Sequence, residues 1–255
     1  MTAAELNSAL ASVGMTLPID AVDKLCAYAN MLVEQNKTMN LIGPATESEL
    51  ATRHFLDSLA PLWTECSTRT KCSTWNILSD TCCDNSPALI DIGTGAGFPG
   101  MVLAIALPRL RVTLCDSLAK RTAFLSRVAE TLDLQNVEVL TARAEELGHT
   151  DRRESFDFVT ARAVTATRAL CELCLPLLRV GGTLLAYKTA RAADEIAEAS
   201  NAARKLGGAL LEPFDYTLVD SHGEQAVMRL QPIRKTAHTP PSYPRPWGKI
   251  KSNPL

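Results

Sequence analysis

The sequence has no run of about 18 apolar residues, the length that a membrane-spanning helix needs. Its first ten residues, MTAAELNSAL, lack the basic and apolar segments of a secretory signal peptide. We therefore expect a protein of the cytoplasm with no membrane contact. With 255 residues, 46% of them hydrophobic, the chain is long enough for one α/β domain with an appended piece.

A recognisable metal or redox motif is also missing, although the chain has eight cysteines. Four thiols lie in apolar periodic stretches, where they pack like small hydrophobic groups: Cys26, Cys115, Cys171 and Cys174. The other four cluster in one polar stretch without the spacing of Cys-x-x-Cys knuckles: Cys66, Cys72, Cys82 and Cys83. We expect no metal site and interpret this stretch as a solvated insertion, with zinc or disulfides as the alternative.

The C-terminal end contains no acidic residue. Residues 225–255 carry a charge of +6, so residues 1–224 carry −8 of the net −2. A basic end on an acidic body suggests contact with a polyanion, and a solvated surface segment is the alternative. Tyr243 and Trp247 stand between cations and would suit stacking on a base, unless Trp247 packs against the domain. The Pro-rich last residues predict no regular secondary structure.

Apolar periodicity predicts helices over 4–13, 19–35 and 47–62. From residue 88 onward, strands alternate with helices, which indicates crossover helices on a mostly parallel, seven-stranded sheet that a hairpin closes. The predicted strands are 88–93, 111–116, 137–142, 156–161, 183–188, 214–220 and 225–232. We divide the chain into a helical N-terminal extension (1–64), a Cys-rich polar insertion (65–87), an α/β core (88–235) and a basic Pro-rich tail (236–255).

The segment DIGTGAGFPG, residues 91–100, joins the first strand to a helix and fits two ligand fingerprints. Gly95, Gly97 and Gly100 spell the G-x-G-x-x-G of dinucleotide sites, whereas Asp91, Gly93, Gly95 and Gly97 spell D-x-G-x-G-x-G. In both, glycines let the backbone approach the ligand, and the helix N-terminus offers free N–H groups. A phosphate-binding P-loop is excluded because no Gly-Lys-Ser/Thr follows.

An acid at Asp91 favours S-adenosylmethionine over a dinucleotide. A dinucleotide places a pyrophosphate there, whereas S-adenosylmethionine carries an ammonium and a sulfonium that a carboxylate balances. Asp116 ends the second strand, where a carboxylate binds ribose hydroxyls in either case. Ala144 and Glu145 follow the third strand and are candidates to flank the adenine. We therefore predict an S-adenosylmethionine site at the carboxyl edge of the sheet.

The acceptor loop after the fourth strand reads TARAV, residues 160–164. It lacks the Asn-Pro-Pro-Tyr-like turn used for exocyclic amines and the cysteine needed for pyrimidine C5. An acceptor with a free lone pair remains, and guanine N7 fits. Arg143, Arg162 and Lys188 follow three neighbouring strands and would suit phosphates or a base edge, with surface salt bridges as the alternative.

The chain resembles the bacterial small-subunit ribosomal RNA guanine-N7 methyltransferases, also called glucose-inhibited division protein B. The segments that carry the resemblance are NLIG (40–43), RHFLDSLA (53–60), DIGTGAGFPG (91–100), LCDSLAKRTAFL (114–125), ARAEEL (142–147), FDFVTARAV (156–164), YK (187–188) and the tail YPR…NPL. The Cys-rich stretch departs from the family pattern.

The resemblance implies a class I methyltransferase fold with an N-terminal helical extension. It implies cofactor contacts at Gly93, Phe98, Ala144, Glu145 and Arg162, and a ribose contact at Asp116. It also implies functional roles for Arg143, Arg162 and Lys188. His54 and Asp57 would either shape the pocket mouth or make a structural helix contact.

Together these features predict an S-adenosylmethionine-dependent enzyme that methylates guanine N7 in 16S ribosomal RNA. Its partner would be that RNA or the small ribosomal subunit, and nothing in the sequence requires more than a monomer. Two alternatives stay open: a small-molecule methyltransferase, which would turn over without RNA, and a non-catalytic RNA-binding assembly factor. An NAD-dependent oxidoreductase is a more distant alternative.

Overall fold

The computed structural model describes residues 1–43, 49–63, 86–219 and 223–255. The insertion predicted at 65–87, with its four cysteines, lies outside these residues except for its last two positions. Within the described parts, no helix has the length and apolar character to cross a bilayer.

A single mixed sheet forms the centre of the molecule, in the order β3-β2-β1-β4-β5-β8-β6, with β7 also paired to β8. β1 to β5 run parallel, and β8 is antiparallel to its neighbours. The strands are β1 (Ala88–Ile92), β2 (Arg111–Asp116), β3 (Val137–Thr141), β4 (Phe156–Arg162), β5 (Leu178–Thr189), β6 (Gly208–Leu210), β7 (Phe214–Val219) and β8 (Gln225–Lys235). The strand order switches at β1, because β2 and β3 lie on one side of it and β4 and β5 on the other. Ligands of such sheets bind at the carboxyl ends of the strands beside this switch point, so we expect the site at the carboxyl end of β1.

The described residues form eight strands, one more than the sequence predicts. The additional strand, β6, spans three residues and pairs with the end of β8, and so short a segment leaves no alternation to recognise. β7 and β8 form the predicted hairpin. β5 begins at Leu178, before the predicted position, and its pairing with β4 is irregular between Phe156 and Phe158.

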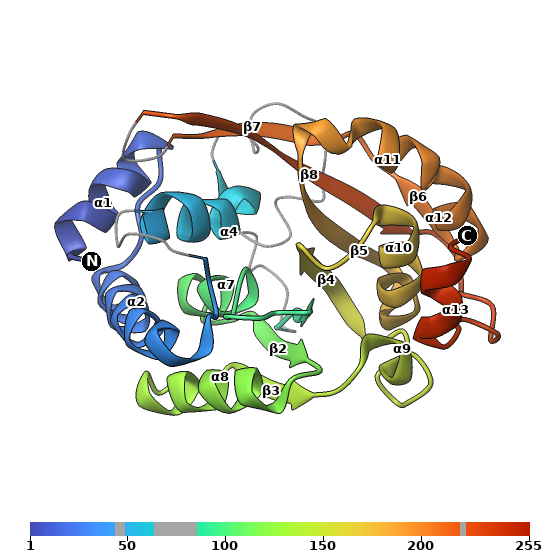
Figure 1. The fold of residues 1–255 in the computed structure, drawn as a ribbon, viewed down its shortest axis with the longest axis horizontal. Helices are drawn as coiled ribbons and strands as arrows, with labels where there is room; N and C mark the ends of the chain where they lie inside the picture. The colour runs from blue at the N-terminus through green and yellow to red at the C-terminus, as the bar shows by residue number, and fades with distance from the viewer. Residues whose placement is uncertain (44–48, 64–85, 220–222) are drawn as a thin grey trace.

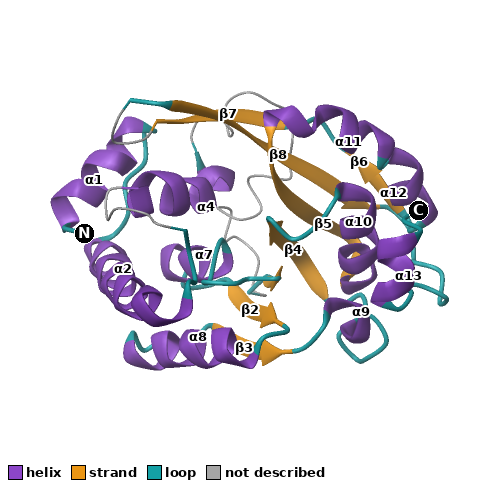
Figure 2. Ribbon diagram, in the orientation of Figure 1, coloured by secondary structure: helices purple, strands orange, loops and turns teal. Residues whose placement is uncertain are grey.

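Helices cover both faces of the sheet because consecutive strand residues point to opposite sides. Leu89 packs into one apolar cluster and Ile90 into the other, and both are fully buried. Figures 1 and 2 show the N-terminal helices at one end of the molecule and the last helices at the other. The longer helices are α1 (Ala3–Ser12), α2 (Ile19–Met39), α7 (Gly100–Ala106), α8 (Ala119–Thr131) and α10 (Thr167–Cys174).

Short helical segments complete the chain, and three of them replace one longer helix expected from the sequence. The predicted helix 47–62 is a π-helical segment η1 (Leu50–Leu56) followed by α4 (Asp57–Leu59) and the 3₁₀ turn η2 (Ala60–Leu62). The chain between β5 and β6 forms two short helices, α11 (Ala193–Glu198) and α12 (Ser200–Lys205). The remaining short elements are α9 (Ala144–Leu147), η3 (Leu175–Leu177), η4 (Ala190–Ala192) and α13 (Trp247–Ser252).

Helix α13 shows that the prediction of an irregular C-terminal end was wrong for six residues. Pro246 stands at the N-cap, where its missing N–H costs no hydrogen bond. Ile250 is fully buried in the cluster that contains α10, and Tyr243 and Trp247 pack partly buried against that cluster. Tertiary packing, rather than local sequence preference, therefore orders this Pro-rich segment.

Candidate functional site

The loop from β1 to α7, here called the glycine loop, is fixed by hydrogen bonds to Asp91, which is fully buried. Its Oδ2 accepts from the Gly100 N–H at 3.0 Å, and its Oδ1 accepts from the Thr160 hydroxyl at 2.8 Å. Burial raises the pKa of Asp91 to about 6, although these hydrogen bonds oppose the shift. Asp91 thus joins the start of α7 to β4 and fixes the loop between them.

The loop glycines at 93, 95 and 97 have φ values of +65°, +59° and +109°, a region that favours glycine. A Cβ at Gly97 would lie 2.5 Å from the Tyr28 hydroxyl oxygen, so Gly97 is needed for packing against α2. Around Gly95, by contrast, only the Gly93 carbonyl oxygen of the described residues would come within 4 Å of a Cβ, at 3.8 Å. Among the described residues, the space beside the Gly95 Cα is therefore open.

Asp116 lies at the end of β2 beside this open position and is 4% exposed. Its Oδ2 accepts from the Gly95 N–H at 3.0 Å, and its Oδ1 accepts from the Leu118 N–H at 3.0 Å. Arg121 donates to the same carboxylate at 3.2 Å. The structure therefore brings the second-strand acid and the glycine loop together, as the sequence predicts.

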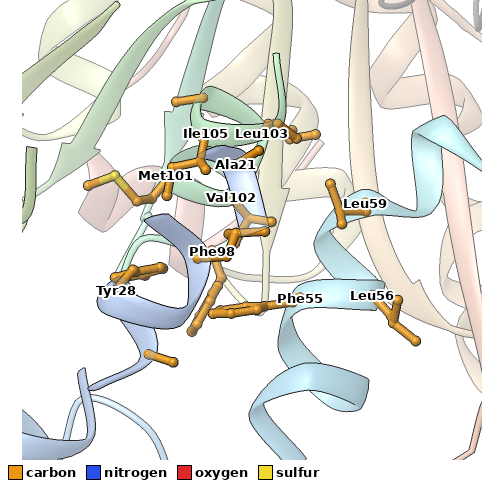
Figure 3. Packing of buried hydrophobic residues seen from close by; sticks show 14 of the residues in the cluster. Ala21, Tyr28, Phe55, Leu56, Leu59, Phe98, Met101, Val102, Leu103 and Ile105 are labelled. Atoms are coloured by element: carbon orange, nitrogen blue, oxygen red, sulfur yellow. The ribbon is translucent and has the colours of Figure 1, made fainter. Parts of the chain in front are cut away.

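The N-terminal extension reaches the site through its π-helical segment and α4. Figure 3 shows Phe98 of the glycine loop beside Tyr28 and Phe55. The ring centroids of Tyr28 and Phe55 lie 5.8 and 6.0 Å from that of Phe98. The His54 ring stacks on Phe98 at 4.8 Å. Tyr28 also donates a hydrogen bond to the Ala96 carbonyl. The extension thus forms one wall around the glycine loop.

Arg162, at the end of β4, is held by this wall. Its guanidinium donates to Asp57 Oδ2 at 2.7 Å and to His54 Nδ1 at 2.9 Å, and it lies 4.9 Å from the Phe98 ring centre. Asp57 is also bonded to the Tyr216 hydroxyl of β7. The histidine and the aspartate of the RHFLDSL segment therefore both accept hydrogen bonds from Arg162, which lies 105 residues after Asp57.

His54 is neutral in this arrangement. A guanidinium has no lone pair, so Nδ1 must accept the bond from Arg162, which puts the ring proton on Nε2. Burial and the charge of Arg162 lower the pKa of His54 to about 4. The positive charge of Arg162 is therefore paired with the negative charge of Asp57, and the neutral His54 adds no charge.

The other two predicted catalytic cations lie in different surroundings. Lys188, at the end of β5, donates to the Thr165 carbonyl at 2.8 Å and to Glu195 at 2.9 Å, and its side chain is 13% exposed. Arg143 precedes α9 with its side chain 56% exposed, 3.7 Å from Glu145. Ala144 is buried behind it. All three cations lie at or just after strand ends at the same edge of the sheet, and among the described residues only Arg162 of the three contacts the N-terminal wall.

Three of the six cations of the C-terminal end face carboxylates of the domain itself. Arg245 forms a double hydrogen bond with Glu172, which is fully buried, and Lys235 lies 3.3 Å from Glu154. Arg229 pairs with Asp215 at 2.6 Å. This end therefore docks on the domain, and Trp247 packs against it as the alternative reading of the sequence proposed. Lys249 and Lys251 are exposed.

The thiols of Cys171 and Cys174 are buried in α10, and burial raises the pKa of both. Among the residues with described positions, no group of three His, Cys, Asp or Glu side chains is placed to hold a metal.

Sequence reasoning missed Glu195, Thr167, Tyr28 and Tyr216, all of which support site residues. Tyr28, Thr167 and Tyr216 form these bonds with residues 28 to 159 positions away, whereas Glu195 lies seven positions from Lys188. None of the four belongs to a recognisable motif, so the sequence contains no signal for their roles.

Comparisons with known proteins agree with this architecture. A family model described as rRNA small subunit methyltransferase G matches residues 21–212. The chain is 40% identical to ribosomal RNA small subunit methyltransferase G of Leuconostoc citreum over 256 residues, which covers all of both chains. It is 38% identical to the protein of that name from Lachnoclostridium phytofermentans, over 96% of this chain and 94% of the other.

Among solved structures, a protein of Thermoplasma acidophilum described as a methyltransferase aligns with a TM-score of 0.50 at 12% identity. The alignment covers 60% of this chain and 70% of that one. At this identity the likeness supports the fold alone.

Proposed function

The chain belongs to the rRNA small subunit methyltransferase G family, and on that premise we propose that it transfers the methyl group of S-adenosylmethionine to guanine N7 of 16S ribosomal RNA. The observation that carries the proposal is the open backbone at Gly95 beside the Asp116 carboxylate, at the switch point of a methyltransferase-type sheet. A ligand with a ribose and a cationic amino-acid end fits that combination.

The cofactor site is assigned to the carboxyl edges of β1, β2 and β3. The backbone of Gly93, Gly95 and Gly97 would hold the amino-acid part, and Asp116 would bind the ribose hydroxyls. Ala144 and the mostly buried Glu145 would flank the adenine, with Phe98 and Arg162 closing the opposite side. Asp91 would fix the glycine loop through its hydrogen bond from Gly100 and would add negative charge near a cationic ligand.

S-adenosylmethionine supplies a methyl group on a sulfonium, which is ready for in-line displacement. Guanine N7 offers a lone pair and loses no proton on methylation, so the protein needs no general base. Its task is to align the acceptor, which well-oriented binding alone can accomplish. Arg162, fixed by Asp57 and His54, would orient the acceptor side of the site, and the exposed Arg143 would contact a phosphate.

The substrate base must leave its stack before N7 can reach the methyl group. We assign the RNA or small subunit to the carboxyl edge of the sheet, with Lys249 and Lys251 as secondary contacts. We further propose that the protein acts as a monomer in the cytoplasm and needs no metal. The N-terminal extension would then be part of the site and the C-terminal end a docked support.

The test uses the full-length protein, radiolabelled S-adenosylmethionine and small ribosomal subunits that lack the modification. Label on one guanine, mapped by chain cleavage at N7-methylguanine, supports the proposal. Label in a small molecule without RNA would favour the small-molecule alternative. Tight RNA binding without any transfer would favour an assembly factor. Asp116→Ala, which removes the ribose carboxylate, serves as the inactive control.

A further inference from the structure

The Glu195 carboxylate of α11 connects three elements near the glycine loop. Its Oε1 accepts from the Thr167 N–H at 2.7 Å, from the Thr167 hydroxyl at 2.5 Å and from Lys188 Nζ at 2.9 Å. Lys188 Nζ also donates to the Thr165 carbonyl at 2.8 Å. We call these four residues, Thr165, Thr167, Lys188 and Glu195, the Glu195 clip.

The Glu195 clip caps the N-terminus of helix α10. Its N-cap residue, Ala166, has no side chain that could accept from the first N–H groups, and Glu195 supplies the missing acceptor from another helix. The positive end of the helix favours a carboxylate at this place. Burial opposes charge on Glu195, but the bonds from Thr167 and Lys188 outweigh burial and lower its pKa. The clip is therefore ionised at neutral pH.

The clip holds residues 163–166, which connect β4 to α10 immediately after Arg162. Ala163 has a φ of +56°, a left-handed backbone conformation that is unfavourable for a residue with a Cβ. Val164 packs against the glycine loop: a Cβ built on Gly93 would be 2.8 Å from Val164 Cγ2. The segment thus covers the glycine loop in a conformation that its own backbone does not favour.

We propose that Glu195 is a positioning residue for methyl transfer, which fixes residues 163–166 against Gly93, and that Lys188 acts through this clip rather than by touching RNA. The inference rests on the proposed function, because methyl transfer depends chiefly on alignment across this segment. A direct RNA contact by Lys188 is the competing explanation, and its 13% exposure and two internal partners oppose it.

The experiment compares the full-length protein with Glu195→Ala, Glu195→Gln, Lys188→Met and the double variant Lys188→Met/Glu195→Ala. Glu198→Ala is the matched control, because Glu198 is 64% exposed on the same helix and lies 4.0 Å from Arg168. Amide hydrogen exchange of the peptide that contains residues 163–170 is measured without cofactor. Initial rates of methyl transfer to small subunits give kcat and KM.

We expect Glu195→Ala to speed exchange at Thr167 about tenfold, since a charge-assisted bond is lost. Its kcat falls about tenfold while KM for the subunits changes less than about twofold. Glu195→Gln keeps an acceptor, so its exchange rate and kcat should lie between those of Glu195→Ala and the wild type. Glu198→Ala should have the exchange rate and kcat of the wild type. The double variant is no slower than its slower parent, because both substitutions break one unit.

Unchanged exchange and kcat in Glu195→Ala would overturn the inference. So would a double variant whose loss is the product of the two single losses, with KM raised by Lys188→Met, since that is the pattern of a direct RNA contact. If the wild-type protein labels no RNA, the proposed function fails, and the exchange measurement still decides whether the clip holds the segment.

Discussion

Replacing Arg162 with alanine tests the link between the N-terminal extension and the core. In the wild type the Arg162 and Asp57 side chains are 16% and 2% exposed and 2.7 Å apart. Without the guanidinium, the Asp57 carboxylate stays buried with the hydrogen bond from Tyr216, and His54 loses its donor.

Removal of one partner from a buried ion pair costs about 3–5 kcal/mol, because the remaining charge is left uncompensated. A domain whose stability exceeds about 5 kcal/mol, as in most of the usual range of about 5–15 kcal/mol, survives this loss, so Arg162→Ala should still fold. For a chain of this size, about 2–4 °C per kcal/mol predicts a melting temperature roughly 6–20 °C lower. Methyl transfer should be abolished, because Arg162 precedes the segment that covers Gly93.

The assays are thermal and urea unfolding, both followed by circular dichroism, and methyl transfer to small subunits. Arg162→Lys is the matched control, since one ammonium keeps the charge beside Asp57 but cannot span both Asp57 and His54. The stability of Arg162→Lys should lie between that of the wild type and that of Arg162→Ala. Arg162→Met combined with Asp57→Asn should recover part of the lost stability, because no buried charge is left alone. A loss below about 1 kcal/mol in Arg162→Ala would refute the buried-pair reasoning, and methylation at the normal rate would refute the site assignment.

Three other predictions follow from single contacts. Gly97→Ala should lose about 1–3 kcal/mol because its Cβ meets the Tyr28 hydroxyl at 2.5 Å, whereas Gly95→Ala should lose about 1 kcal/mol from backbone strain but bind S-adenosylmethionine about tenfold more weakly. Thermal unfolding and calorimetric titration measure the two effects, and equal cofactor affinities would contradict the assignment of Gly95. The pKa of His54, lowered to about 4 from 6.5, means that the unfolded chain takes up this proton first as pH falls. From pH 7 to pH 5 the wild type should therefore lose about 1–2 kcal/mol more stability than His54→Gln, and parallel urea-unfolding curves would disprove it. Arg245→Ala leaves a fully buried Glu172 without its partner and should cost about 3–5 kcal/mol with little change in KM for subunits; a raised KM at unchanged stability would mean that Arg245 contacts RNA.

The sequence by itself determined most of the sheet and the edge of the sheet at which we predict the ligand. β2 occupies the predicted residues 111–116, and the other long strands begin or end within a few residues of their predictions except at the start of β5. Buried parallel strands are continuous apolar runs bounded by turn residues, so their positions are written locally. The glycine loop and Asp116 were recognisable because backbone conformation and strand-end carboxylates are local features too.

The tertiary structure alone decided which side chains meet. Asp57 and Arg162 are 105 residues apart, Tyr216 lies 159 residues from Asp57, and Arg245 lies 73 residues from the buried Glu172. The charge of the C-terminal end was visible in the sequence, but its carboxylate partners were not, and neither were α13 and the Glu195 clip. Local patterns set where each element begins and which face is apolar, whereas the partner of a buried charge is set by chain topology, which brings together residues that share no sequence neighbourhood.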